Sequence, residues 1–197
     1  MDLFIATKNP AKSREFKEFL GDSFRIVSLA DIGGSPDMEE TGETFEENSL
    51  LKAKFYFEGL GIPVIADDGG LAIDYLNGEP GVKSRRWPGY EASDQELIDM
   101  VLQKLKGVSW EQRTASFKIV LTFYDTNSIL QESASTEGYI TEKQIVRCEP
   151  GFPFRTIFWV TQFGKIYQDL TPDEHRVINH RRFACEKIKQ KILKLAK

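Results

Sequence analysis

The sequence predicts an α/β protein, because segments typical of strands and segments typical of helices follow one another along the chain. Apolar runs that end in polar turn residues predict buried strands at residues 3–6, 24–29 and 64–66. Apolar residues at helical spacing predict helices after Pro10 and after Thr44. The chain has 197 residues, which fits a single domain, or a single domain with two lobes, over residues 1–197.

Composition and charge exclude several classes of protein. Hydrophobic residues make up 41% of the chain and charged residues 28%, which is typical of a soluble globular protein. No apolar run approaches the roughly 20 residues of a membrane span, and no basic segment precedes the first strand, so we expect a cytoplasmic protein that has no signal peptide and binds no membrane. The net charge of −4 does not favour a nucleic-acid partner. Cys148 and Cys185 form no spaced framework, which fits a reducing compartment and argues against a thiolate zinc site.

A candidate anion site follows the first strand. Asn9 is a good N-cap and Pro10 a good first residue for a helix that Gly21 can end. Thr7 and Lys12 add a hydroxyl group and a positive charge beside the N–H groups of the helix start, which attract anions. The glycines of a Walker A loop are missing, and an ordinary capped helix explains the same pattern.

The second helix is predicted by a capping box. Thr44 and Glu47 have the spacing of such a box, and Gly59 is a candidate for the end of the helix. Three apolar residues at helical spacing would form its buried face: Leu50, Ala53 and Phe57.

The stretch at residues 64–74 carries the main candidates for chemistry. An apolar run ends in two aspartates and two glycines at 67–70, which predicts a buried strand that opens into a tight loop. Neighbouring side chains of a strand point to opposite faces, so at least one carboxylate would be buried and would need a cation or hydrogen bonds. A hard divalent cation fits, and a polar turn is the alternative. Glu39 and Glu40, in the loop before the second helix, are placed to join the aspartates.

The rest of the chain contains further elements and two loops of interest. Turn residues at 77–81 precede Arg85 and Arg86, which predict either a surface loop or a phosphate-facing arginine. A helix is predicted from Ser93 to Leu105, and two long strands at 115–124 and 129–140.

An aromatic-rich loop begins at residue 151. Phe152 and Phe154 flank a proline; such rings usually pack in a core, although a nucleobase can stack on them. Thr171 begins a helix that residues 179–181 interrupt, and an apolar stripe continues through Ala184 to the end.

Together these segments resemble the inosine/xanthosine triphosphate pyrophosphatase family. Residues 7–12 look like its triphosphate-binding motif, and residues 39–53 match its second block closely. The sequence ADDGGL at 66–71 is similar to the family's ADDSGL, and residues 76–81 continue into Ser84-x-Arg86 as in the family. Each motif is weak alone, but five in the family's order and spacing are specific.

The resemblance implies a fold, a reaction and partners. The fold is an α/β, ITPase-like structure with a long mixed sheet flanked by helices, in two lobes with a central cleft. The reaction is hydrolysis of deaminated purine nucleoside triphosphates (ITP, dITP, XTP) to the monophosphate and pyrophosphate, which cleanses the nucleotide pool. The cofactor is Mg²⁺, and the chain is expected to form a homodimer.

The resemblance also implies the site residues. Glu40 and Asp68 would bind the metal with Asp67 as an accessory, and Asp68 would position or deprotonate the attacking water. Lys12 and Lys52 would neutralise charge on the phosphate oxygens. The other implied substrate-binding residues are Thr7, Asn9, Gly69, Phe152, Phe154, Arg155, His175, His180 and Arg181.

The match weakens in the C-terminal half. The family's GFGYDPIF appears here as GFPFRTIF, with Pro153 for glycine and Arg155 for aspartate. Its EKNxISHR appears as EHRVINHR, with His175 for lysine and Asn179 for serine. Beside the implied catalytic acid, Gly69 replaces serine.

These replacements fall in the part that is implied to read the base. Our hypothesis is that metal-dependent hydrolysis persists while the base preference has shifted or loosened. Arg155 either replaces the lost lysine charge or occludes the base pocket. Two alternatives remain: a paralogue that hydrolyses another modified nucleoside triphosphate, and a nucleotide-binding protein without turnover. The retained Glu40 and Asp68 argue against the last.

Overall fold

The computed structural model describes residues 1–34, 38 and 40–195. Glu39, which the sequence placed beside Glu40, lies outside the described residues. In the described chain, seven strands form one sheet in the order β2-β1-β3-β4-β5-β6-β7. The strands are β1 Asp2–Ala6, β2 Arg25–Ser28, β3 Val64–Ile73, β4 Thr114–Tyr124, β5 Ile129–Ile140, β6 Phe158–Val160 and β7 Lys165–Ile166. The helices are α1 Pro10–Leu20, α2 Phe45–Leu60, α3 Asp94–Lys104, α4 Pro172–Ile178 and α5 His180–Leu195.

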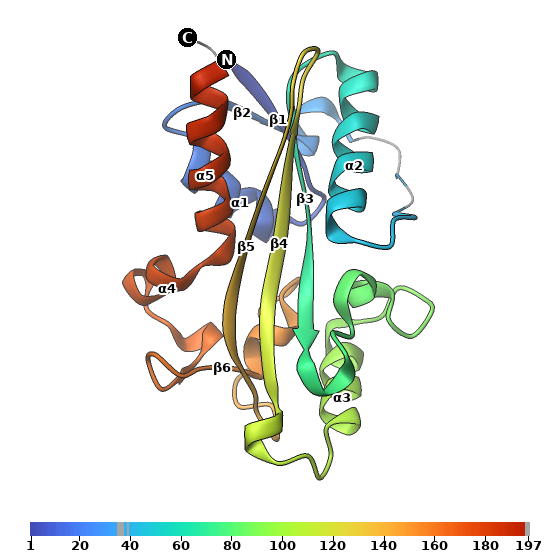
Figure 1. The fold of residues 1–197 in the computed structure, drawn as a ribbon, viewed down its shortest axis with the longest axis vertical. Helices are drawn as coiled ribbons and strands as arrows, with labels where there is room; N and C mark the ends of the chain where they lie inside the picture. Colours follow the sequence, from blue (N-terminus) through green and yellow to red (C-terminus); the bar gives the residue numbers. More distant parts are fainter. Residues whose placement is uncertain (35–37, 39, 196–197) are drawn as a thin grey trace. The chain divides into compact units, whose positions relative to one another are not determined.

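The sheet is mixed. β1 runs parallel to β2 and β3, whereas β6 runs antiparallel to both β5 and β7 (Figure 1). The predicted α/β class, with a long mixed sheet flanked by helices, is therefore confirmed. No helix of the described residues is long and apolar enough to cross a membrane.

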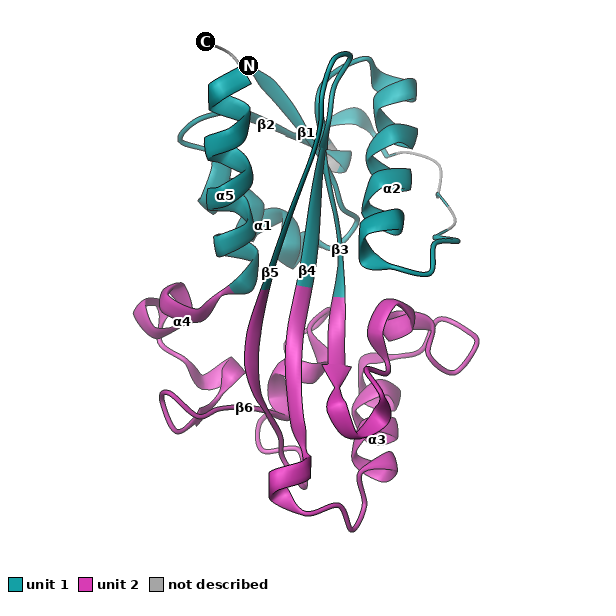
Figure 2. Ribbon diagram, in the orientation of Figure 1, with its two compact units in different colours: residues 1–69, 119–134, 180–197 teal, residues 70–118, 135–179 magenta. Residues whose placement is uncertain are grey.

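The chain divides into two compact units (Figure 2). Unit 1 comprises Met1–Gly69, Ile119–Ala134 and His180–Lys197, and unit 2 comprises Gly70–Lys118 and Ser135–Asn179. The chain therefore passes from one unit to the other within β3, β4 and β5, and again between α4 and α5. The prediction of a single domain with two lobes stays a prediction.

Each unit has its own hydrophobic core. In unit 1, β1 is buried on both faces: Leu3 and Ile5 belong to the cluster that contains α1 and α5 residues, and Phe4 and Ala6 belong to the cluster that contains α2 residues. Side chains alternate along a strand, so a continuous apolar run suits a strand that is covered on both sides. In unit 2, residues of α3, β4 and the loop after residue 151 share one cluster.

The predicted loop at residues 67–70 is wrong. β3 continues without interruption through both aspartates and both glycines. At Gly70 a Cβ atom would collide with the Ser84 side chain and with the carbonyl oxygen of Gly81, so glycine is required there for close approach of another segment. A pair of glycines after an apolar run is explained either by a turn or by the close approach of another segment. The sequence pattern does not show which segment lies beside the glycines, so it does not decide between the two.

The predicted end and buried face of α2 also need correction. The helix runs through Gly59 and is capped by Gly61, which has the left-handed conformation with φ of 66°. Its buried residues are Asn48, Ser49, Ala53 and Tyr56, whereas Leu50 and Phe57 are only partly buried.

The buried face of α2 includes two polar residues because their polar atoms find partners. The Gly42 N–H donates to Asn48 Oδ1 at 2.7 Å, and Ser49 Oγ lies 2.7 Å from Thr122 Oγ1. Hydrogen bonds of this kind offset the cost of burying polar groups, which apolar periodicity alone does not detect.

Candidate active site

The two aspartates of β3 are both buried in unit 1. Only 2% of Asp67 and 7% of Asp68 is exposed. Adjacent residues of a strand face opposite ways, so the two side chains have different surroundings although they are neighbours in sequence. Their partners differ accordingly.

Asp67 is paired with lysine. Lys12 Nζ lies 2.7 Å from Asp67 Oδ2, which joins the first turn of α1 to β3. Burial alone would raise the pKa of Asp67, but the positive charges of Lys12, Arg181 and Lys52 outweigh burial and lower it. Asp67 is therefore ionised and holds the Lys12 ammonium in place.

Lys52 of α2 joins the backbone of β3 to the loop before α2. Its Nζ donates to the carbonyl oxygen of Asp67 at 3.0 Å and lies 2.5 Å from Glu40 Oε1. Burial would lower the pKa of Lys52, but the carboxylates of Asp67, Glu40 and Asp68 outweigh burial and raise it. Lys52 therefore keeps a positive charge next to both aspartates.

The cost of burying a negative charge is offset less at Asp68 than at Asp67. Its Oδ1 accepts from the Gly69 N–H at 2.9 Å, whereas its buried Oδ2 has no hydrogen-bond partner among the described residues. Burial raises the pKa of Asp68 to about 6; Lys52 opposes this rise and Glu40 adds to it. A buried carboxylate oxygen with no donor is suited to a cation.

The set of donors fits a magnesium site that is completed by other ligands. Glu40 and Asp68 supply two carboxylates, and Mg²⁺ is usually held by one or two carboxylates together with waters and substrate phosphates. Within the part of the chain that the structure describes, no group of three or more His, Cys, Asp or Glu side chains is arranged to hold a metal alone.

The predicted anion site is built on the start of α1. Asn9 caps the helix, and its Oδ1 accepts from the N–H groups of Ala11 at 2.9 Å and Lys12 at 3.4 Å, which confirms the predicted cap. The Asn9 N–H in turn donates to Thr7 Oγ1 at 3.3 Å. The turn that carries Thr7, Asn9 and Lys12 is thus held by its own side chains.

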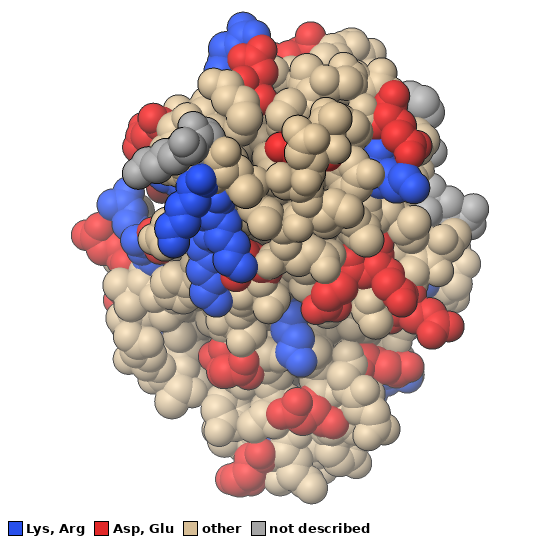
Figure 3. Space-filling model, turned by 45° about the horizontal axis from the view of Figure 1, so that its top comes forward, with Lys and Arg blue, Asp and Glu red and all other residues tan. Residues whose placement is uncertain are grey.

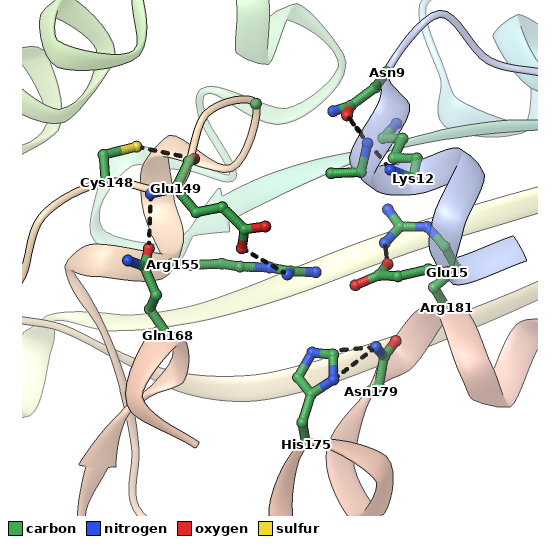
Figure 4. A network of polar contacts seen from close by, with 12 residues as sticks. Asn9, Lys12, Glu15, Cys148, Glu149, Arg155, Gln168, His175, Asn179 and Arg181 are labelled. Carbon is green, nitrogen blue, oxygen red and sulfur yellow. Dashed lines mark hydrogen bonds and ion pairs between the residues drawn. The ribbon is translucent and has the colours of Figure 1, made fainter. Parts of the chain in front are cut away.

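At the start of α5, His180 and Arg181 are both buried. The Arg181 guanidinium bonds the carboxylate of Glu15, so it links α5 to α1, and Figure 4 shows the two side chains facing each other. Its positive charge also helps to lower the pKa of Asp67. The sequence did not single out Glu15.

The remaining predicted residues lie in unit 2: Phe152, Phe154 and Arg155 at the short 3₁₀ helix Pro153–Thr156, and His175 in α4. Phe154 belongs to the hydrophobic core of that unit, which is the packing role that the sequence left open. The Arg155 guanidinium lies 3.5 Å from the centre of the Phe152 ring. His175 Nε2 lies 3.2 Å from the side-chain nitrogen of Asn179, a contact drawn in Figure 4.

Asn48 was missed by sequence reasoning. Its side chain hydrogen-bonds Asp68 and thereby lowers the pKa of that carboxyl, which limits the effect of burial. The one signal in the sequence was its position, because Asn48 is a polar residue directly after the capping box. Helix propensity gave no reason to expect that its side chain is buried.

Charge on the surface is mixed. On the face drawn in Figure 3, Lys and Arg side chains and Asp and Glu side chains lie in small groups separated by uncharged atoms. This distribution accords with the small net charge of −4.

Comparisons with known proteins agree with the motifs. Residues 3–191 match the model of the Ham1 family. A dITP/XTP pyrophosphatase of Bacillus subtilis (strain 168) is 44% identical over 193 residues, which cover 95% of this chain and 94% of the relative. A dITP/XTP pyrophosphatase of Thermoanaerobacter sp. (strain X514) is 40% identical over 195 residues, which cover 98% of each chain.

Solved structures of Ham1 proteins also match this chain. The Staphylococcus aureus Ham1 protein has a TM-score of 0.85 at 32% identity and covers 100% of both chains. A HAM1 protein from Coxiella burnetii has a TM-score of 0.85 at 33% identity, with 98% of this chain and 99% of that chain covered. The resemblance stated from the motifs is confirmed.

Proposed function

Because this chain belongs to the Ham1 family, we propose that it is a nucleoside triphosphate pyrophosphatase that hydrolyses ITP, dITP and XTP to the monophosphate and pyrophosphate. Relatives named dITP/XTP pyrophosphatase match it over nearly its full length. The observation that carries the proposal is the pair of buried aspartates on β3, of which one is fixed to lysine and the other has an oxygen with no donor among the described residues.

The triphosphate would be bound by the start of α1 and by two lysines. Lys12 is held by Asp67, and Lys52 is held by Glu40 and the carbonyl oxygen of Asp67. Ammonium groups fixed before the substrate arrives need little reorganisation when negative charge develops on phosphate oxygens. Thr7 and Asn9 would orient the phosphate chain by hydrogen bonds.

Asp68 is assigned the catalytic role. Its raised pKa of about 6 leaves the carboxylate ionised near neutral pH, and makes it a stronger base than an ordinary aspartate. It would orient the attacking water and accept its proton as the bond between the α- and β-phosphoryl groups breaks. Glu40 and Asp68 would also hold Mg²⁺, which, when bound, neutralises charge on the phosphate oxygens.

Residues of unit 2 would read the base: Phe152 offers an aromatic ring for stacking, and Arg155 and His175 offer hydrogen-bond donors. The base-binding roles that the resemblance implies for His180 and Arg181 stay predictions. We further propose a cytoplasmic homodimer, which the family resemblance supports and which light scattering coupled to size-exclusion chromatography would test.

A substrate panel tests the activity. ITP, XTP, dITP, GTP, ATP and pyrimidine triphosphates would be incubated with the protein and Mg²⁺, and pyrophosphate would be scored against phosphate. We expect pyrophosphate release from ITP, dITP and XTP, with far slower reaction of GTP and ATP. Release of phosphate alone, or equal rates for GTP and ITP, would contradict the proposal. Nucleotide binding without any release would support the alternative of a binding protein without turnover.

A further inference from the structure

Two residues of α2 join the loop before this helix to β3 within unit 1. Asn48 and Lys52 are four positions apart, so they lie on the same face of the helix, one turn from each other. Lys52 Nζ lies 2.5 Å from Glu40 Oε1 and donates to the carbonyl oxygen of Asp67 at 3.0 Å. Asn48 makes the same kind of link one turn earlier, through its side-chain amide.

The two ends of the Asn48 amide have different partners. Asn48 Oδ1 accepts from the Gly42 N–H at 2.7 Å, and the side chain also hydrogen-bonds the Asp68 carboxyl. A carboxylate only accepts hydrogen bonds, so the NH₂ group of Asn48 is the donor to Asp68. Only 2% of Asn48 is exposed, so water competes little for either bond.

The contact between the loop and Asn48 depends on a glycine. A Cβ atom at residue 42 would lie 2.6 Å from Asn48 Oδ1 and 2.8 Å from Glu47 Cβ, closer than side chains approach each other. Glycine therefore permits the hydrogen bond between the loop and the helix. Because Gly42 is two residues after Glu40, this bond and the pairing of Glu40 with Lys52 hold the same short segment.

The turn of α2 that carries Asn48 is itself fixed to the sheet. The next residue, Ser49, is buried, and its Oγ lies 2.7 Å from Thr122 Oγ1 of β4. Gln131 of β5 donates to the same Thr122 oxygen and to the carbonyl oxygen of Glu46, each at 2.9 Å. These bonds do not involve the Asn48 side chain, so they would keep the turn in place when that side chain is replaced.

The link to Asn48 bears on the orientation of the Asp68 carboxylate. Asp68 Oδ1 accepts from the N–H of Gly69, which is the adjacent residue, at 2.9 Å. Asn48 ties the same carboxyl to another element of unit 1, and Asp68 Oδ2 is left without a hydrogen-bond partner among the described residues. Hydrogen bonds from outer residues orient carboxylates that bind metals, so this arrangement presents Oδ2 in a fixed direction.

We propose that Asn48 is a positioning residue that holds the Asp68 carboxylate and the Glu40 segment in one arrangement, ready to receive a divalent cation. The inference rests on the proposed function, because it assumes that Glu40 and Asp68 bind the metal that accompanies the triphosphate. Loss of an outer hydrogen bond to a metal-binding carboxylate costs about 10–100-fold in metal affinity or activity.

The test combines metal binding with turnover in two variants and a control. Asn48→Leu is similar in size but has no hydrogen-bonding group, and Gly42→Ala pushes on Asn48 Oδ1 while the asparagine stays in the chain. Ser49→Ala is the matched control, because it removes a buried polar group of the same turn whose partner is Thr122.

Three quantities would be measured on each protein. Binding of Mn²⁺ alone, an ion that takes the same oxygen ligands as Mg²⁺, would be followed by the electron paramagnetic resonance signal of the free ion. The values of kcat and KM for ITP would come from pyrophosphate release at saturating Mg²⁺. Urea unfolding in EDTA would give the free energy of unfolding, which separates a loss of fold from a loss of positioning.

The expected result is a loss of metal binding and turnover that stability does not explain. Asn48→Leu and Gly42→Ala should weaken Mn²⁺ binding and lower kcat by at least about tenfold, with KM for ITP changed less than about threefold because Lys12 and Lys52 remain. Ser49→Ala should be less stable than wild type but keep its Mn²⁺ affinity and kcat.

A double-mutant cycle shows whether Asn48 acts through Asp68. Once Asp68→Asn has removed the carboxylate, adding Asn48→Leu should change the residual turnover of ITP by less than about twofold. A further loss of about tenfold in that background would overturn the inference, because Asn48 would then act independently of Asp68.

Other outcomes would also overturn the inference. These are wild-type Mn²⁺ affinity and kcat in Asn48→Leu, or a loss of Mn²⁺ affinity in Ser49→Ala as large as that in Asn48→Leu. If Asn48→Leu does not fold, Gly42→Ala decides by the same criteria. If wild type binds Mn²⁺ but releases no pyrophosphate from any triphosphate, the proposed function fails instead, and the Mn²⁺ affinities of the variants still decide the role of Asn48.

Discussion

Replacing Asp68 by asparagine should stabilise the protein in the absence of metal while abolishing its activity. Asparagine has nearly the same shape, and its Oδ1 still accepts from the Gly69 N–H, but it carries no charge. Burial raises the pKa of Asp68 from the ordinary 3.8 to about 6. At 1.36 kcal/mol per pKa unit, this difference means that the ionised carboxylate destabilises the folded state by up to about 3 kcal/mol.

The sign of the pH dependence follows from proton linkage. Between about pH 4 and about pH 6 the folded protein holds a proton on Asp68 that the unfolded chain has lost, so wild-type stability decreases as pH rises through this range. The free energy of unfolding of Asp68→Asn should therefore equal that of wild type near pH 4 and exceed it by up to about 3 kcal/mol at pH 7. For a chain of this size, about 3 kcal/mol corresponds to roughly 6–12 °C in Tm.

Urea unfolding in EDTA, followed by circular dichroism at several pH values, measures the difference. Asp22→Asn, which removes an exposed carboxylate of the same unit, is the control and should show no such gain. A variant that is less stable than wild type at neutral pH, or a difference that does not change between about pH 4 and pH 7, would refute the reasoning. Turnover of ITP should fall by at least about a hundredfold.

Added magnesium should reverse the order of stability. A ligand that binds only the folded state stabilises it by RT ln(1 + [L]/Kd), so wild type should gain stability with Mg²⁺ concentration. Asp68→Asn, which lacks one proposed ligand, should gain much less. Equal gains in the two proteins would show that Asp68 does not bind the metal.

Three further predictions concern other residues. Lys52→Met, which removes the ammonium between Glu40 and β3, should lower kcat/KM for ITP by about a hundredfold, measured by pyrophosphate release; a loss below about threefold would contradict its role. Arg113 is 2% exposed and donates to four backbone carbonyl groups of unit 2, three of them at 2.7 Å. Arg113→Met should therefore lower the free energy of unfolding, measured in urea, by about 3 kcal/mol, and a loss below about 1 kcal/mol would contradict this. Burial, together with the negative charge of Asp94, raises the pKa of Cys148 to about 11. Iodoacetamide at about pH 8 should therefore alkylate Cys148 about a hundredfold more slowly than a free cysteine. A rate near that of free cysteine, measured by mass spectrometry, would contradict this prediction.

The helix caps and strands that depend on nearby residues could be predicted from the sequence. The cap at Asn9, the capping box at Thr44, and the long strands β4 and β5 all form where the pattern predicts them. Each is decided within a few residues by a hydrogen bond to a nearby N–H group or by alternation of side chains. The family resemblance was also recognisable from the sequence, because it is carried by short motifs in a fixed order.

The failures share one cause, which is a neighbour distant in sequence. The glycines of β3 were interpreted as a loop because the approach of Ser84 and Gly81 to Gly70 is invisible in the local pattern. The buried face of α2 was misplaced because Ser49 finds its partner 73 residues away, at Thr122.

The sequence by itself determined that two adjacent aspartates end an apolar run, that lysines precede them, and that arginine replaces aspartate in the aromatic loop. Only the tertiary structure decided how these groups differ. Lys12, 55 residues away, pairs with Asp67, so that carboxylate is ionised, whereas burial leaves Asp68 with a raised pKa and an oxygen without a donor in the described chain. The charge state of a carboxylate depends on burial and on the charges within a few ångströms, and both are properties of the folded chain.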